Sequence, residues 1–99
     1  MTVTPKAMRL LEAIVDLEDR PGGGVVGRVL ATRLWPDAPG WRTHSNSGGI
    51  GAGMPRAAGC QAGKLSRLAT PLTQYIGWQH GWTLTKAGRQ AVADHRSSG

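Results

Sequence analysis

Glycine and proline divide this chain into short segments, and these breaks limit which elements it can form. Fifteen of the 99 residues are glycine, and they cluster at 22–24 and again within 36–53. Glycine loses more backbone entropy than any other residue on folding, and proline removes an amide donor, so both interrupt helices and central strands. We therefore expect one small α+β domain over 1–96, mostly helical, with a thin core and one long loop.

The N-terminal segment has the pattern of an amphipathic helix. Thr4 followed by Pro5 is typical of an N-cap and a first helical position. Apolar residues recur at helical spacing through 7–17, which predicts a helix of about fifteen residues that stops at Pro21. The acids of this helix form either a solvated face or a surface for a basic partner. They are Glu12, Asp16, Glu18 and Asp19.

A second helix and a long loop follow the first glycine cluster. Apolar spacing predicts a helix that starts at residue 25 or 26 and extends to Trp35, where Pro36 ends it. Residues 36–53 are dominated by Pro, Gly, Ser and Asn, as loops are. At about eighteen residues this loop is long for a small domain, and such loops are either functional or disordered. Trp41 is expected to pin it to the body.

Charge is distributed unevenly along the chain. The formal net charge is +6, and no Asp or Glu occurs from 38 to 93. The cations in this acid-free run are Arg42, Arg56, Lys64, Arg67, Lys86 and Arg89. A carboxylate among them would repel a phosphate and neutralise a neighbouring cation, so a surface without carboxylates suits a polyanion. Nucleic acid is therefore the first partner that the sequence predicts.

The third helix is expected over 55–69, beginning at Pro55. Its apolar stripe contains Ala58, Ala62, Leu65 and Leu68 or Ala69. The opposite stripe contains Arg56, Cys60, Lys64 and Arg67, with Gln61 beside it. Gly59 and Gly63 each lower helix propensity by about 1 kcal/mol relative to Ala, but they allow another backbone or DNA to approach closely.

A hairpin and a last helix complete the chain. Residues 71–76 and 81–85 have the pattern of strands separated by a turn over 77–81, which predicts a β-hairpin. The period of two lets Leu72, Ile76, Trp82 and Leu84 face the core. Thr85 is expected to cap a helix over 86–96, with 97–99 as a disordered tail. Trp35 and Trp82 are expected as core anchors, whereas Trp78 in the turn either packs under the hairpin or stacks on DNA.

No motif in the chain supports catalysis. Residues 48–53 (GGIGAG) lack the preceding strand of a dinucleotide site, and 58–65 (AGCQAGKL) lack the first glycine and the hydroxyl residue of a phosphate-binding loop. A metal-dependent nuclease needs clustered carboxylates, which the acid-free run excludes over most of the chain. Cys60, His44, His80 and His95 have no zinc spacing. We therefore expect no enzymatic activity, no cofactor and no metal.

Cysteine content and hydropathy bear on localisation. The chain has one cysteine, no signal peptide and no apolar run of transmembrane length. A cytoplasmic protein associated with the nucleoid, without membrane contact, is the expectation.

Two segments give the chain a resemblance to a known family. GKLSRL (63–68) lies on a basic, leucine-bearing helix, and GWTLTKAGRQAV (81–92) joins a hairpin to a closing helix. With the order helix, helix, helix, hairpin, helix, they resemble the winged helix-turn-helix proteins of the MarR type, with a looser similarity to small winged-helix proteins of actinobacterial phages. The resemblance implies binding to double-stranded DNA. The helix over 55–69 would lie in the major groove, and the hairpin over 71–85 would be a wing at the backbone.

The resemblance also implies positions for the DNA contacts. Four side chains would lie on the recognition helix, two at the wing tip, and two at the wing base against phosphates. They are Arg56, Gln61, Lys64 and Arg67; Gln79 and His80; and Lys86 and Arg89, of which Arg89 could instead cap neighbouring carbonyls. The chain departs from the family in its long loop, in the absence of arginine at the wing tip, and in its lack of long terminal helices. Only the first and last helices offer a surface for a homodimer.

Three functions fit this sequence. The first is a DNA-binding protein, either a transcriptional regulator or a nucleoid-like architectural factor. The alternative is a winged-helix protein–protein interaction module that does not bind DNA. RNA binding is a third reading, for which only Tyr75 and the tryptophans could supply stacking. Part of the long loop is either disordered or a second DNA contact, namely Arg42, His44, Ser45 and Asn46.

Overall fold

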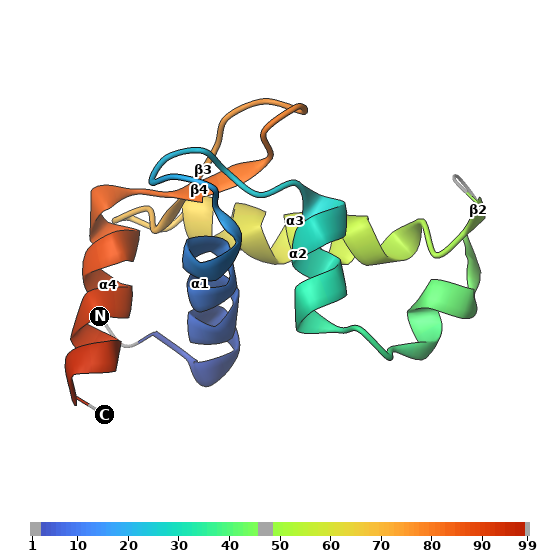
Figure 1. Cartoon of the computed structure of the whole chain (residues 1–99), viewed down its shortest axis with the longest axis horizontal. Coiled ribbons are helices and arrows are strands. Elements are labelled where there is room, and N and C mark those ends of the chain that lie inside the picture. The colour runs from blue at the N-terminus through green and yellow to red at the C-terminus, as the bar shows by residue number, and fades with distance from the viewer. Residues whose placement is uncertain (1–2, 46–48, 99) are drawn as a thin grey trace.

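Four α-helices and two antiparallel strand pairs make up the part of the chain that the computed structural model describes, residues 3–45 and 49–98. The helices are α1 (Pro5–Leu17), α2 (Gly27–Leu34), α3 (Gly53–Ser66) and α4 (Lys86–Ser98). The strands are β1 (His44–Ser45), which pairs with β2 (Gly49–Ile50), and β3 (Thr73–Tyr75), which pairs with β4 (Trp82–Leu84). This confirms the predicted α+β class and the predicted order of helices and hairpin (Figure 1).

Hydrogen bonds to terminal groups explain where α1 begins and ends. The Thr4 hydroxyl accepts a hydrogen bond from the Ala7 amide at 3.1 Å, and Pro5 occupies the first turn, as predicted. The helix ends at Leu17, short of the predicted proline, because Glu18 adopts extended backbone. The buried face of α1 comprises Met8, Leu10, Leu11, Ala13 and Ile14.

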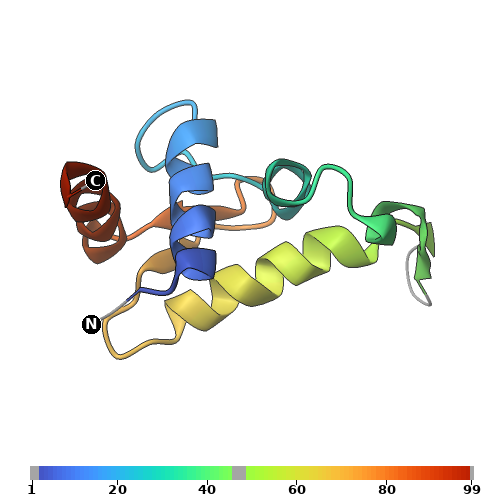
Figure 2. The same ribbon diagram turned by 90° about the horizontal axis from the view of Figure 1, so that it is seen from below.

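Small residues bring three helices together around one core. Ala31 of α2 and Ala58 and Ala62 of α3 are fully buried, so neither helix is held away from its neighbours by a large side chain. Leu10 and Leu30 are also fully buried, and burial of a leucine side chain is worth about 1.5–3 kcal/mol. In Figure 2, α1 crosses α3 while α2 is seen nearly end-on beside them. This arrangement leaves the far side of α3 uncovered by other helices.

Both faces of the β3–β4 hairpin are covered at its base. Thr73 pairs with Leu84 and faces α3, where its hydroxyl donates to a carbonyl at 2.5 Å. Thr83 lies on the opposite face, and its hydroxyl donates to the Glu18 carboxylate at 2.7 Å. Leu72 and Leu84 are buried, as predicted, but the alternation of the sequence gives no sign that both threonines are buried as well. Their hydroxyls are buried because each has a hydrogen-bond acceptor.

A third extended segment joins the hairpin outside the helices. The Val25 amide donates to the Trp82 carbonyl at 2.8 Å, and the Trp82 amide donates back to the Val25 carbonyl at 2.9 Å. This pairing removes residue 25 from α2, which begins at Gly27 rather than at 25 or 26. A Cβ on Gly81, whose φ is +74°, would overlap the Val25 carbonyl. The connection between α1 and α2 is thereby held against β4.

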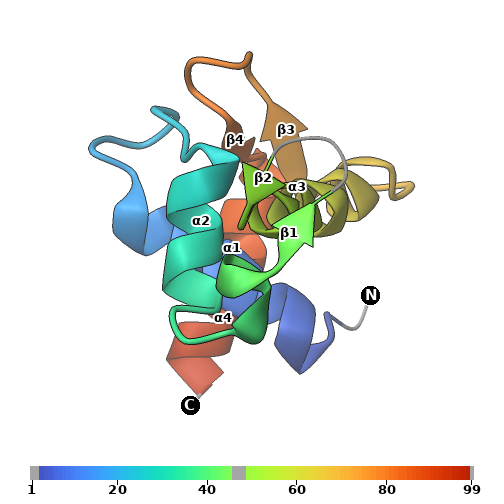
Figure 3. The same ribbon diagram turned by 90° about the vertical axis from the view of Figure 1, so that its right-hand side faces the viewer.

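The segment over 36–53 is more regular than the sequence predicts. A 3-10 helix, η1 (Pro39–Arg42), is followed by the short β1–β2 pair, which Figure 3 shows at the near end of the molecule. The Trp41 indole donates to the Trp35 carbonyl at 2.6 Å, which confirms that Trp41 pins this segment to the body. The prediction of an irregular loop is therefore wrong for the described part. Asn46 lies outside the described residues.

The last helix starts at the predicted cap and runs further than predicted. The Thr85 hydroxyl accepts from the Gly88 amide at 3.1 Å and donates to the Pro71 carbonyl at 2.6 Å. α4 continues to Ser98, so most of the predicted tail is helical, while Gly99 lies outside the described residues. None of the described helices combines the length and apolar character needed to cross a bilayer.

Candidate nucleic-acid interface

The outward stripe of α3 has the composition that its sequence predicts. Arg56, Cys60, Lys64 and Arg67 are exposed, on the side of the helix opposite the buried Ala58 and Ala62. Six of the fourteen residues of α3 are glycine or alanine, so little besides these side chains projects from the helix. The predicted apolar stripe is correct for its first three members only, because the helix ends at Ser66 and both Leu68 and Ala69 are exposed.

The two glycines in the interior of α3, Gly59 and Gly63, face the β3–β4 hairpin. A Cβ on Gly63 would lie 3.7 Å from the Trp82 ring and 3.2 Å from a guanidinium nitrogen of Arg67. A Cβ on Gly59 would lie 4.0 Å from the Trp82 indole nitrogen. The bare backbone therefore admits Trp82, which is half-buried and confirmed as an anchor, rather than a DNA backbone. The same contact places Arg67 beside the hairpin.

The other edge of the stripe meets the start of α1. Gln61 and Lys64 line a shallow groove of about 200 Å³ together with Thr4, Lys6 and the first turn of α1. Gln61 is half-buried there, and Lys64 is exposed. Lys6 thus joins the basic surface, although it was not predicted from the sequence because this lysine lies far from the acid-free run. Its exposed position in the first turn of a helix is the only signal that could have identified it.

The turn between β3 and β4 presents three polar or aromatic side chains. Gln79 and His80 are exposed, as predicted, and line a hollow with the segment over 23–26. Trp78 is 80% exposed, so it does not pack under the hairpin. Tyr75, on the same hairpin, is 53% exposed, and its ring centroid lies 5.1 Å from that of Trp82. The hairpin is therefore aromatic where a basic tip would be typical.

Arg89 departs from its predicted role. Its guanidinium donates to a Glu18 carboxylate oxygen at 3.0 Å and to the Thr83 hydroxyl at 3.1 Å. The Glu18 side chain is only 2% exposed, so Arg89 serves as counter-ion to a buried acid. Arg89 is therefore engaged within the fold, and the candidate surface is defined without it. Lys86, one turn earlier in α4, is exposed.

The Glu18 carboxylate connects four parts of the chain. It accepts hydrogen bonds from the Gly24 amide at 2.9 Å, from the Thr83 hydroxyl at 2.7 Å and from Arg89 at 3.0 Å. Burial on its own raises the pKa of this carboxyl, but the hydrogen bonds from Gly24, Thr83 and Arg89, with the Arg89 charge, hold the pKa below its ordinary value. Glu18 is therefore ionised at neutral pH and joins α1, the α1–α2 connection, β4 and α4.

The remaining acids of α1 are also paired within the chain. Asp16 contacts Arg33 of α2 at 3.3 Å and Arg96 of α4 at 3.0 Å, and Glu12 contacts His95 at 3.2 Å. Three of the four acids predicted as this face, Glu12, Asp16 and Glu18, are thus paired within the chain, whereas Asp19 is exposed. Among the residues that the structure describes, no ion pair joins Lys64, Arg67 or Lys86 to a carboxylate. By contrast, Arg33 of α2 and Arg89 and Arg96 of α4 each form an ion pair with an acid.

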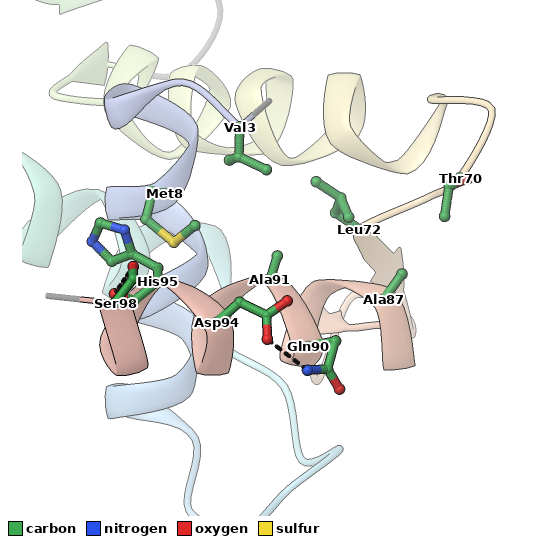
Figure 4. Close-up of a pocket in the computed structure, with 10 residues that line it drawn as sticks. All are labelled: Val3, Met8, Thr70, Leu72, Ala87, Gln90, Ala91, Asp94, His95 and Ser98. Atoms are coloured by element: carbon green, nitrogen blue, oxygen red, sulfur yellow. Dashed lines mark hydrogen bonds between the residues drawn. The ribbon is translucent and has the colours of Figure 1, made fainter. Parts of the chain in front are cut away.

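A larger hollow of about 510 Å³ lies between α4, the start of the chain and the base of β3 (Figure 4). Its apolar lining comprises Val3, Met8, Leu72, Ala87 and Ala91. Among its polar residues, Gln90 donates to Asp94 at 2.8 Å, and His95 contacts Glu12 of α1. These polar groups are engaged with one another or with α1, so this hollow resembles a packing surface more than a reaction site.

Neither a candidate metal site in the described residues nor a similar known protein was found. Over residues 3–45 and 49–98, no three His, Cys, Asp or Glu side chains lie where they could hold a metal ion. Comparisons with protein-family models, with curated proteins and with solved structures found no match to this chain.

Proposed function

We propose that the protein binds double-stranded DNA as a winged helix-turn-helix domain. In this proposal α3 is the recognition helix in the major groove, and the β3–β4 hairpin is the wing beside it. The order of the elements and the pairing of Val25 with the hairpin support it. The short β1–β2 pair would occupy the position of an extended turn between α2 and α3, with Arg42 and His44 available as a second contact with DNA.

One observation carries the proposal, namely the exposed basic stripe of α3. The stripe combines Arg56, Lys64 and Arg67 on a helix that otherwise presents small residues on that side. A major groove about 12 Å wide admits one α-helix, and cations along that helix reach the phosphates on either side. Lys6 adds a positive charge in the groove beside Lys64, and the exposed Lys86 at the start of α4 adds another. The proposed surface comprises Lys6, Arg56, Gln61, Lys64, Arg67, Gln79, His80 and Lys86.

The same surface favours contacts with the DNA backbone over reading of bases. Of the residues on α3, Gln61 has an amide side chain suited to adenine, but it is half-buried against α1. Arg56, Lys64 and Arg67 can each reach a guanine or a phosphate. A transcriptional regulator and a nucleoid-like architectural factor therefore remain the two forms of the proposal. The absence of more base-reading side chains on the described stripe favours the architectural form.

A protein-interaction module remains the alternative function. The acidic side chains that would form its partner surface are, however, mostly used in ion pairs within the domain. Glu12, Asp16 and Glu18 are paired with basic side chains of α2 or α4, and only Asp19 of the four predicted acids is outside these pairs. A homodimer through α1 and α4 would have to use the outer side of α4 and the hollow of Figure 4, because α1 gives its apolar face to the core. Sedimentation velocity at micromolar concentrations measures this state independently of DNA.

Fluorescence anisotropy on labelled duplexes across a salt series tests the proposal. With about five phosphates neutralised by the cations of this surface, the slope of log K against log salt should be about −4.5. The double variant Lys64→Glu, Arg67→Glu should abolish binding. Arg9→Glu, an equal charge change per site on the exposed outer face of α1, should retain most of it. Absent or salt-independent binding by the wild-type protein would exclude the proposal.

A further inference from the structure

The tip of the β3–β4 hairpin presents a tryptophan to solvent in a defined turn. Trp78 is 80% exposed, the largest exposed fraction of any large hydrophobic side chain in the described chain. Gly77 and Gly81 on either side of the tip have φ angles of +107° and +74°, which residues other than glycine rarely adopt. The Gly81 amide donates to the Gly77 carbonyl at 2.7 Å, and the His80 amide shares that acceptor at 3.2 Å. The turn is therefore closed on itself.

The base of this turn is attached to the body of the domain. A Cβ on Gly24 would overlap the His80 carbonyl, and one on Gly81 would overlap the Val25 carbonyl. The Ile76 amide donates to the Gly81 carbonyl at 2.9 Å, which closes the hairpin beyond β3. These contacts fix the direction in which the tip leaves the domain, and in Figure 1 the loop after β3 projects away from the helices. Holding the backbone of the tip in place before binding lowers part of the entropy cost of a contact made by Trp78.

The tip is continuous with the basic stripe of α3. Arg67 lies against Gly63, Gly63 lies against the Trp82 ring, and Trp82 lies against Tyr75, from which the chain enters the turn. From α3 to the hairpin, the surface thus passes from Arg67 over the backbone at Gly63 to the rings of Trp82 and Tyr75. A duplex that contacts α3 therefore meets the hairpin on its aromatic side.

The chemistry of the tip does not suit a phosphate contact. Residues 77–81 contain no lysine or arginine, so the tip has no permanent positive charge with which to contact phosphates. Apolar side chains that DNA-binding proteins place in the minor groove act differently, since they insert at a base step and kink the duplex. Stacking of a base on an aromatic side chain also tolerates any sequence, because every base has an aromatic face.

We infer that Trp78 is a wedge that stacks at a base step where the hairpin meets the minor groove, an inference that rests on the proposed DNA binding. Pyrimidine–purine steps, TA above all, open at the lowest cost. The protein therefore selects DNA by its deformability, at positions that α3 does not read. Gln79 and His80, beside the wedge, can hydrogen-bond to base edges or sugars once the step is open.

Two duplexes of equal length and base composition, one with repeated TA steps and one with none, test this inference. Anisotropy measures affinity, and energy transfer between end labels measures bending. Trp78→Ala should bind the TA duplex about 5- to 100-fold more weakly than wild type. It should lose both the TA preference and the bend, while its salt slope stays unchanged because Trp78 carries no charge. Trp78→Phe should retain most of the affinity, and Gln74→Ala, at an exposed position of β3 outside the proposed surface, should behave as wild type for bending. Circular dichroism verifies that each variant is folded.

The outcomes separate this inference from the proposed function. Salt-dependent binding that is unaffected by Trp78→Ala would overturn the wedge and leave DNA binding in place, with Trp78 free for a protein partner. Loss of affinity by that variant without loss of bending or of the TA preference would also overturn it, because such a contact would be superficial. If the wild-type protein binds neither duplex, the proposed function and the wedge fail together.

Discussion

Replacement of the buried Glu18 by glutamine should destabilise the whole domain. The carboxylate is 2% exposed and accepts hydrogen bonds from Gly24, Thr83 and Arg89. The amide group introduced by Glu18→Gln would keep one acceptor and present donors to groups that are themselves donors, and Arg89 would lose its counter-ion. Breaking a buried pair in this way costs about 3–5 kcal/mol. Because Arg89 is 33% exposed and water can reach it, we expect the lower end, about 3 kcal/mol.

Urea unfolding followed by circular dichroism measures this loss. A small domain has a free energy of unfolding of about 5–15 kcal/mol, so Glu18→Gln removes a large part of it. The thermal midpoint should fall by roughly 10–25 °C, since each kcal/mol shifts it by about 4–8 °C in a domain of this size. Asp19→Asn is the matched control, because Asp19 is exposed and should lie within about 0.5 kcal/mol of wild type. A Glu18→Gln variant as stable as this control would refute the assignment of Glu18 as the junction of the fold.

The same carboxylate gives stability an expected pH dependence. The pKa of Glu18 is lower in the folded chain than its ordinary value of 4.5, so the folded state binds the proton less readily than the unfolded state. The contribution is complete above the unfolded pKa and is lost as pH falls below 4.5 through the folded pKa. Urea midpoints should therefore fall more steeply below pH 4.5 in the wild-type protein than in Glu18→Gln. Parallel curves for the two proteins would contradict this account.

Two further predictions concern the interface and the packing. Lys64→Gln and Lys6→Gln should each reduce the magnitude of the salt slope by about 0.9 in anisotropy titrations, and an unchanged slope for Lys6→Gln would exclude that residue from the surface. Gly88→Ala should lower the thermal midpoint, with a cost of about 1–3 kcal/mol, because its Cβ would overlap the Leu72 carbonyl. Gly63→Ala should be tolerated by comparison, since the closest atom, at 3.2 Å, is the end of a flexible arginine side chain.

Local patterns in the sequence predicted the helices and the hairpin because short-range interactions determine them. The Thr4 and Thr85 caps act within three residues of themselves, and the apolar stripe of α3 follows from helical spacing. The errors have long-range causes. α2 starts late because Val25 pairs with Trp82, and the segment over 36–53 is ordered partly because Trp41 reaches Trp35.

The exposed residues of the candidate site that lie on the single helix α3 could be predicted from the sequence. Those whose position depends on contacts between different elements could not. Arg56, Lys64 and Arg67 are exposed because their spacing places them on one stripe. The pairing of Arg89 with Glu18 spans 71 residues, and no sequence pattern indicates it. The contact of Lys6 with the groove beside Lys64 is equally remote in sequence. Together the two corrections exchange one cation, Arg89, for another, Lys6, so the number of cations in the predicted surface stays the same while its position changes.

The composition of α3 is hard to explain by stability alone. Acids four residues from Lys64 or Arg56 would add about 0.2–0.5 kcal/mol per pair, yet the helix contains none. Its two interior glycines, Gly59 and Gly63, cost about 1 kcal/mol each relative to alanine, and packing against Trp82 accounts for their size but not for the missing acids. The chain does make ion pairs elsewhere, between α1 and both α2 and α4. Acids of α1 therefore join helices of this domain, while α3 itself contains none, and this distribution suits the DNA contact that we propose for α3.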